Sequence, residues 1–194
     1  MSLLYSLISP PAVTAVSLAD CKADLRVENT NENDLIEAYI EAATKYCSEV
    51  VGRKLINETW KYSIDGLYGQ AIKLPFNPVS SIVEIQYFDT DNVSQTVDVN
   101  NFYLYNFDQY SELFPILNYS FPSVYSRRDA INITFVAGYG ATETEIPITI
   151  RKAIRLLVAH WYEVRTASTV GVDVKDIPFG VDALLGVERT GWCA

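Results

Sequence analysis

Few side chains in this sequence have the types and spacing that catalysis requires. His160 is the single histidine, so a pair of histidine metal ligands or a relay between two histidines cannot form. Its position between Ala159 and Trp161 favours a structural or partly exposed histidine over a catalytic one. The serines and tyrosines have no convincing partner base. We therefore expect no catalytic residues and no enzymatic activity.

The candidate ligands for metals and phosphates are incomplete. Asp89 and Asp91 could suggest calcium, but their loop lacks the twelve-residue ligand pattern. Glu143 and Glu145 flank a turn, and paired carboxylates on an acidic protein are usually solvated. The segment GYGATETE, residues 138–145, has two glycines without the Lys and Ser/Thr of a phosphate-binding loop. We expect no metal and no cofactor, and a strand-to-helix turn at these glycines.

The cysteines do not indicate a disulfide framework or a zinc cluster. Cys21, Cys47 and Cys193 are odd in number and share no short spacing, which fits reduced thiols in a cytoplasm. No apolar run approaches the roughly 20 residues of a membrane-spanning helix. The first residues also lack the basic start of a signal peptide. We therefore expect a soluble protein that is not exported.

The net charge of −9 over 194 residues is unevenly distributed. Residues 71–146 carry nine acidic and three basic side chains, whereas residues 147–167 carry four basic and one acidic. A bare acidic surface repels phosphate, which disfavours sequence-independent nucleic-acid binding over most of the protein. Arg127, Arg128 and the segment 147–167 are the exceptions that could form local basic patches.

Two helices are predicted before the aromatic-rich middle of the chain. The segment SLAD at Ser17 resembles a capping box, with Asp20 in place of the usual Glu or Gln, and predicts a short helix to about Arg26. A second helix should begin near Asn33 and end at Gly52. Its apolar residues recur at three- and four-residue steps, which predicts a buried stripe. The stripe consists of Leu35, Ile36, Tyr39, Ile40, Ala43, Cys47, Val50 and Val51.

Strands are predicted over residues 55–146. The segment SIVEIQYF, residues 81–88, alternates apolar and polar side chains, and DTDN, residues 89–92, is typical of a hairpin turn. Nine of the thirteen tyrosines and seven of the eight phenylalanines lie in this part of the chain, which favours strands over loops. The exception is NYSFPSVYSRRD, residues 118–129, which we interpret as an extended loop that could reach a neighbour.

A last helix is predicted from Pro147, where a missing N–H costs nothing, to about Thr166. Its apolar face should pack against the second helix, with Trp161 as a core anchor. That face consists of Ile150, Ala153, Ile154, Leu157, Val158 and Trp161.

A Ser-, Thr- and Gly-containing connector follows this helix and leads to an apolar tail. We expect the tail to be poorly ordered in the isolated subunit and to order on a partner. The predicted partner-binding residues are Ile177, Pro178, Phe179, Val181, Leu184 and Leu185.

Several segments follow one another in a distinctive order from about Ser17 to Gly186. The most specific are LPFNPV (74–79), VAGYG (136–140), AHWYEVR (159–165) and PFGVDALL (178–185). Their order and spacing resemble the head-tail connector, or adaptor, proteins of tailed phages and prophages.

This resemblance implies a structural protein that forms a ring on the portal of a filled head and joins the head to the tail. Its partners would be the portal protein, tail or head-completion proteins, and further copies of itself. Its location would be the head-tail junction of the virion, and the host cytoplasm during assembly. DNA would pass through without specific binding, and an acidic surface would not stall it. No membrane partner is implied.

A ring requires a head-to-tail interface between unlike faces of each subunit. The basic last helix and the acidic middle could supply those faces. The alternative function is a carbohydrate- or protein-binding β-rich module of a virion or cell, because an aromatic-rich β segment would suit sugar stacking or an adhesive sheet face. The flanking helices argue against such a free-standing module.

The predicted fold class is α+β, with a helical bundle formed by N- and C-terminal helices and a β-rich insertion between them. Residues 1–54 would form the N-terminal helical part, residues 55–146 the insertion, and residues 147–194 the C-terminal helix and docking tail. We expect these parts to form one compact domain overall.

Overall fold

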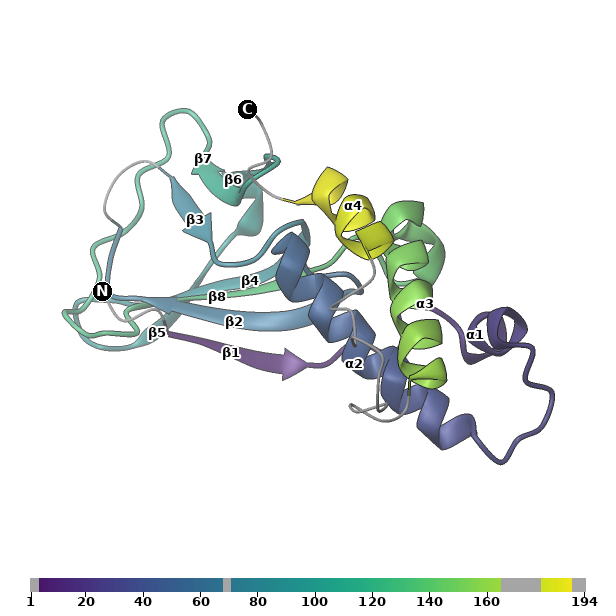
Figure 1. Ribbon diagram of the computed structural model, residues 1–194. Helices are drawn as coiled ribbons and strands as arrows, with labels where there is room; N and C mark the ends of the chain where they lie inside the picture. The colour runs from purple at the N-terminus through teal and green to yellow at the C-terminus, as the bar shows by residue number, and fades with distance from the viewer. Residues whose placement is uncertain (1–3, 68–70, 165–178, 190–194) are drawn as a thin grey trace. The chain divides into compact units, whose positions relative to one another are not determined.

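The computed structural model describes residues 4–67, 71–164 and 179–189. Its internal contacts group into two compact units, whose elements are labelled in Figure 1. We call Met1–Ala12 together with Asn57–Tyr139 the β unit, and Val13–Ile56 together with Gly140–Ala194 the helical unit. Each unit is therefore built from two separate stretches of the chain.

The larger sheet of the β unit has five strands in the order β1-β2-β8-β4-β5. In that order the strands are β1 (Leu4–Ser9), β2 (Glu58–Ile64), β8 (Ile131–Ala137), β4 (Val79–Phe88) and β5 (Ser94–Val97). Every neighbouring pair is antiparallel. The two edges of the sheet are therefore β1, drawn in purple in Figure 1, and β5.

A second, three-stranded sheet has the order β3-β7-β6 and is also antiparallel. Its strands are β3 (Ile72–Leu74), β7 (Ser111–Pro115) and β6 (Phe102–Asn106), and the short helix η1 (Val99–Asn101) leads into β6. Side chains alternate across this sheet, as in β3, where Ile72 and Leu74 are buried and Lys73 is exposed. The buried face of this sheet shares one hydrophobic core with the five-stranded sheet.

The centre of that core is β8, which pairs with β2 on one side and β4 on the other. Its residues Ile131, Ile133 and Phe135 are fully buried. Most residues of β8 are buried, which suits its mostly apolar sequence INITFVA. Removal of a large side chain here should therefore leave a cavity that the sheet cannot easily close.

The helical unit contains four α-helices and one short 3-10 helix among its described residues. They are α1 (Leu18–Leu25), α2 (Asn33–Val51), η2 (Glu143–Glu145), α3 (Ile148–Glu163) and α4 (Phe179–Glu188). The Ser17 hydroxyl accepts a hydrogen bond from the Asp20 N–H at 3.1 Å and caps α1, as the sequence predicts. Gly52 ends α2 with a φ of 70°, a left-handed conformation that glycine adopts readily.

The core of the helical unit confirms most of the predicted stripes, although Leu35, Tyr39 and Val50 are only half-buried. The buried residues of α2 are Ile36, Ile40, Ala43, Cys47 and Val51, and those of α3 are Ile150, Ala153, Ile154, Leu157 and Val158. The two helices pack on one another, because this contact removes much of each apolar face from water. Within the part of the chain that the structure describes, no helix is both long and apolar enough to cross a membrane.

The predicted arrangement of helices and strands is wrong. The chain does not frame a β-rich insertion with a bundle of N- and C-terminal helices, because it starts in a sheet: Leu4 of β1 pairs with Ser63 of β2. The described residues form eight strands in two sheets and four α-helices. The reason for the error is that a strand is stabilised by partners distant in sequence, which the local pattern of Leu4–Ser9 does not reveal.

Trp161 contacts α2 as predicted, but it is not fully buried. Its ring centroid lies 6.3 Å from that of Tyr39, with the two planes inclined at 59°, and both side chains are half-buried. We expect Trp161→Ala to lower the free energy of unfolding by about 1–3 kcal/mol, less than the 3–5 kcal/mol typical of a fully buried tryptophan. Urea unfolding, with the exposed Ile148→Ala as the matched control on α3, measures this difference. A loss above about 4 kcal/mol would contradict partial burial.

Candidate interaction surfaces

The residues considered for catalysis have structural surroundings. His160 is half-buried on α3, and its backbone carbonyl accepts a hydrogen bond from the Val164 N–H at 2.9 Å. Burial raises the pKa of the Cys21 thiol to about 11 and that of Cys47 to about 12. Such thiols stay protonated at neutral pH and are weak nucleophiles. Cys193 lies outside the described residues.

The acidic pairs considered for metal binding form turns instead. The Asp89 carboxylate accepts hydrogen bonds from the backbone N–H groups of Asp91 and Val93, at 3.1 and 2.9 Å. The hydrogen bond from Val93 contributes most to lowering the pKa of Asp89. The Glu145 carboxylate accepts the Thr142 N–H at 2.9 Å and caps η2. Among the described residues, no group of three or more His, Cys, Asp or Glu side chains could hold a metal ion.

The predicted partner-binding residues fall mostly on α4. Val181 and Leu185 are fully buried, and Leu184 is half-buried. Phe179 is the first residue of α4, and Ile177 and Pro178 lie outside the described residues.

Helix α4 packs on α3 and α2 within the helical unit. The Thr149 hydroxyl donates a hydrogen bond of 2.6 Å to the Glu188 carboxylate and ties the end of α4 to α3. The expectation of a poorly ordered tail is therefore wrong from Phe179 onward: this apolar segment covers its own chain. The described residues of α4 that are exposed are Gly180, Asp182, Ala183 and Val187.

The basic face of α3 is partly neutralised by α1. Arg155 donates two hydrogen bonds of 2.6 Å, from Nε and Nη2, to the two carboxylate oxygens of Asp24. Beside this pair lies a shallow depression with both acidic and basic side chains. It is lined by Val16, Asp20, Glu143, Ile148, Arg151, Lys152 and Arg155. This surface is of mixed charge, so it does not form a continuous cationic strip for DNA.

We expect Asp24→Asn to lower the stability of the helical unit by about 0.5–1 kcal/mol at pH 7, the usual range for an accessible ion pair. The hydrogen bonds from Arg155 lower the pKa of Asp24 in the folded state. The stabilisation is therefore present above the unfolded pKa of about 3.9 and is lost as the pH falls through the lower folded value. Urea unfolding of parent and variant at a series of pH values measures it. A difference that grows on acidification would contradict this assignment.

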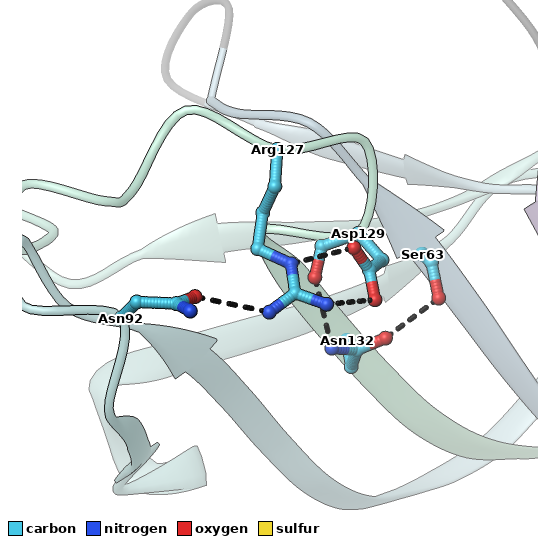
Figure 2. Close-up of polar contacts among 5 residues, drawn as sticks. All are labelled: Ser63, Asn92, Arg127, Asp129 and Asn132. Carbon is cyan, nitrogen blue, oxygen red and sulfur yellow. Dashed lines mark hydrogen bonds and ion pairs between the residues drawn. The ribbon is translucent and has the colours of Figure 1, made fainter.

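Arg127 takes part in a polar network of the β unit, shown in Figure 2. Its Nε and Nη2 donate to both carboxylate oxygens of Asp129, at 2.7 and 2.8 Å, and its Nη1 donates to the Asn92 side chain at 3.0 Å. Asn132 donates to the Asp129 carbonyl at 3.1 Å and accepts the Ser63 hydroxyl at 2.6 Å. The hydrogen bonds from Arg127 lower the pKa of Asp129, so the carboxylate stays ionised and neutralises Arg127 at neutral pH.

The network fastens the loop of residues 118–129 to the β unit. The Arg127 guanidinium also lies 3.8 Å from the centroid of the Phe88 ring, and the Tyr125 N–H donates to the Phe88 carbonyl at 2.9 Å. Tyr119 and Phe121 pack against the core of the same unit. In the predicted basic patch, Arg127 is therefore paired with Asp129 of the same chain. The loop itself packs against the β unit.

The outer face of the three-stranded sheet exposes a row of aromatic rings. Tyr103, Tyr105 and Phe107 follow one another at every second position along β6 and just beyond it, and consecutive ring centroids are 6.2 Å apart. Phe114 of β7 lies opposite Tyr103 in the register. All four side chains are exposed. Rings that are apolar and rigid make such a face suitable for contact with another protein or a sugar.

Residues 14–175 match the Head completion protein family. The match includes most of the chain, and the chain therefore belongs to this family. The resemblance to head-tail connector proteins of tailed phages is confirmed, as is a structural, head-tail connector role in a phage-like particle. Among curated proteins, none is significantly similar in sequence.

The fold is similar to that of chains in gene transfer agent (GTA) particles. A chain in the neck of an empty GTA particle, computed with C6 symmetry, is 23% identical with a TM-score of 0.76, covering 98% of this chain and 97% of that chain. A chain in the virion of a native GTA particle is 22% identical with a TM-score of 0.77 and the same coverage. A chain in the neck of a native GTA particle, computed with C12 symmetry, is 23% identical with a TM-score of 0.70 and covers 97% of each chain.

Proposed function

We propose that this protein completes the head of a phage or prophage particle by forming a ring on the portal protein, and that it acts without catalysis. The observation that carries the proposal is the family match, which spans parts of both the β unit and the helical unit. The protein would act at the head-tail junction and would present a surface to tail or further head-completion proteins.

The charge distribution supports a passive role toward DNA. The chain has a net charge of −9, and Arg127 and Arg155, two cations of its predicted basic patches, are each paired with an aspartate. Phosphate contacts from free Lys and Arg supply most non-specific affinity for DNA. Such a surface would let DNA pass without holding it. The fold similarity supports a ring only indirectly, since the C6 and C12 symmetries describe the GTA necks themselves.

Complementation of a particle-producing strain that lacks this protein tests the proposal. We expect filled heads without tails in its absence, and tailed particles when the parent chain or His160→Ala is supplied. Purified chain should also bind portal-containing heads and should not bind heads that lack a portal. Normal tailed particles in the absence of the protein, or equal binding to both kinds of head, would contradict the proposed function. If particles that contain His160→Ala assemble normally but lose a chemical step such as wall or nucleic-acid hydrolysis, the proposed absence of catalysis is contradicted.

The aromatic face of β6 and β7 supports the alternative of a binding module. Stacked rings such as Tyr105 and Phe107 could hold a sugar. The alternative predicts that the purified monomer binds glycans and that Tyr105→Ala removes this binding. Family membership favours the connector, which predicts no glycan binding.

A further inference from the structure

Strand β1 is an edge strand that lacks the usual protection of an edge. All six of its residues are exposed, and its sequence LYSLIS contains no charged residue and no proline. One side of β1 pairs with β2, and no strand of the described chain pairs with the other. Proteins commonly protect such edges with lysine, proline or a covering segment, because unpaired N–H and C=O groups recruit other strands.

The apolar inner face of the sheet continues onto β1 and is left open there. Tyr5 and Leu7 lie opposite Tyr62 and Trp60 in the register, so they share the core-facing side of β2. The Tyr5 ring contacts the rings of Trp60 and Phe76, with centroids 5.9 and 5.2 Å apart. Tyr5 is nevertheless 49% exposed and Leu7 45% exposed. The core therefore extends past β2 without a strand to close it.

The opposite edge of the same sheet, β5, has matching properties. Its sequence SQTV is also uncharged, and Ser94, Gln95 and Thr96 are exposed. Because every neighbouring pair is antiparallel in the order β1-β2-β8-β4-β5, β1 and β5 point in the same direction. Val97 lies opposite the buried Ile85, so Gln95 and Val97 occupy the inner face, as Tyr5 and Leu7 do on β1.

We propose that β1 of one copy pairs in parallel with β5 of a second copy, so that the five-stranded sheet continues from subunit to subunit. The register shift between Leu7 and Ser9 ends regular pairing after Leu7, which leaves the four residues Leu4–Leu7 to match the four of β5. The natural alignment places Tyr5 beside Gln95 and Leu7 beside Val97. Two different edges of one subunit then form a head-to-tail interface, which is the type that closes a ring. This inference rests on the self-association within the proposed function.

Cysteine cross-linking tests the contact directly. Ser6 and Thr96 are exposed and lie on the outer face, next to one another in the proposed alignment. We expect Ser6→Cys with Thr96→Cys, in a Cys193→Ser background, to give covalent multimers up to the full ring when portal-bound assemblies are oxidised. Each single variant can form no more than dimers. The matched control is Ser6→Cys with Ser81→Cys, because Ser81 is exposed on the part of β4 that pairs with β8 and lies outside the segment paired with β5, away from the proposed contact. Assemblies that yield nothing beyond dimers with the first pair would overturn the inference.

A charge on the open face of β1 provides the second test. We expect Leu7→Lys to weaken self-association at least about tenfold, because pairing would bury an unpaired ammonium group. Val83→Lys is the matched control: Val83 is 56% exposed on the part of β4 that precedes its pairing with β5, outside the edge used in the proposal. Sedimentation with and without portal-containing heads measures assembly, and urea unfolding confirms that the monomers remain folded. Equal assembly of Leu7→Lys and parent would overturn the inference and leave the proposed ring intact. If the parent chain does not assemble even with portal-containing heads, the proposed ring itself is contradicted.

Discussion

Phe135→Ala is expected to lower the free energy of unfolding of the β unit by about 3–5 kcal/mol. Phe135 is fully buried on β8, where it lies opposite Trp60 of β2 and Ile82 of β4. Strands on both sides limit how far the sheet can collapse into the space left by the ring, so the cost of a cavity adds to the lost burial.

The control for this variant is Val83→Ala, since Val83 is exposed on neighbouring β4 and should change stability by less than about 0.5 kcal/mol. Urea unfolding gives the overall loss, and hydrogen exchange of the β2 and β8 amides assigns it to the β unit. A loss below about 1 kcal/mol for Phe135→Ala would contradict the central position of this ring.

Leu185→Ala is expected to destabilise the helical unit by about 2–5 kcal/mol. Leu185 is fully buried on α4, which packs on α3 and α2. If the tail were only a docking peptide for another protein, the same change would weaken partner binding and leave the stability of the monomer unchanged. The result therefore distinguishes a helix that completes its own subunit from a segment reserved for a partner.

The matched control is Val187→Ala, two residues further along α4, where the side chain is 73% exposed. Hydrogen exchange of the α3 and α4 amides, together with thermal unfolding, measures both variants. Equal stability of the two variants would contradict the packing of α4. Loss of portal binding by Val187→Ala in a fully stable protein would show that the open face of this helix contacts the portal.

The helices α1, α2 and α3 could be predicted because their signals lie within a few neighbouring residues. The Ser17 cap, the glycine stop at Gly52 and the apolar spacing of α2 each act over one or two turns. The hairpin at residues 89–92 is also local, and the Asp89 carboxylate stabilises it through backbone N–H groups. Such features depend little on the rest of the fold.

The position of β1 could not be predicted in this way. Tyr5 and Leu7 complete an apolar face whose other members, Trp60 and Phe76, are more than 50 residues away in the sequence. Hydrophobic alternation can indicate a strand, but it does not identify the partner strand.

The candidate surfaces show the same limit. The apolar residues of the tail, such as Val181 and Leu185, indicate a segment that must be covered, but they do not say whether the subunit or a partner covers it. The structure assigns the face to the helical unit. The pairing of Arg155 with Asp24 was similarly hidden, because these residues are brought together only by the packing of α1 and α3. Local charge counts overestimate the cationic surface for this reason.

The division of each unit into two stretches of chain has a consequence for folding during synthesis. β1 leaves the ribosome before its partner β2, which follows only after α1 and α2 have been made. The β unit can close once β8 is complete, whereas α2 must wait for α3 before its apolar stripe is covered. Because domains generally fold as units as they emerge, we expect the β unit to fold first. The nascent α1–α2 segment would then be the part of the chain that chaperones hold longest.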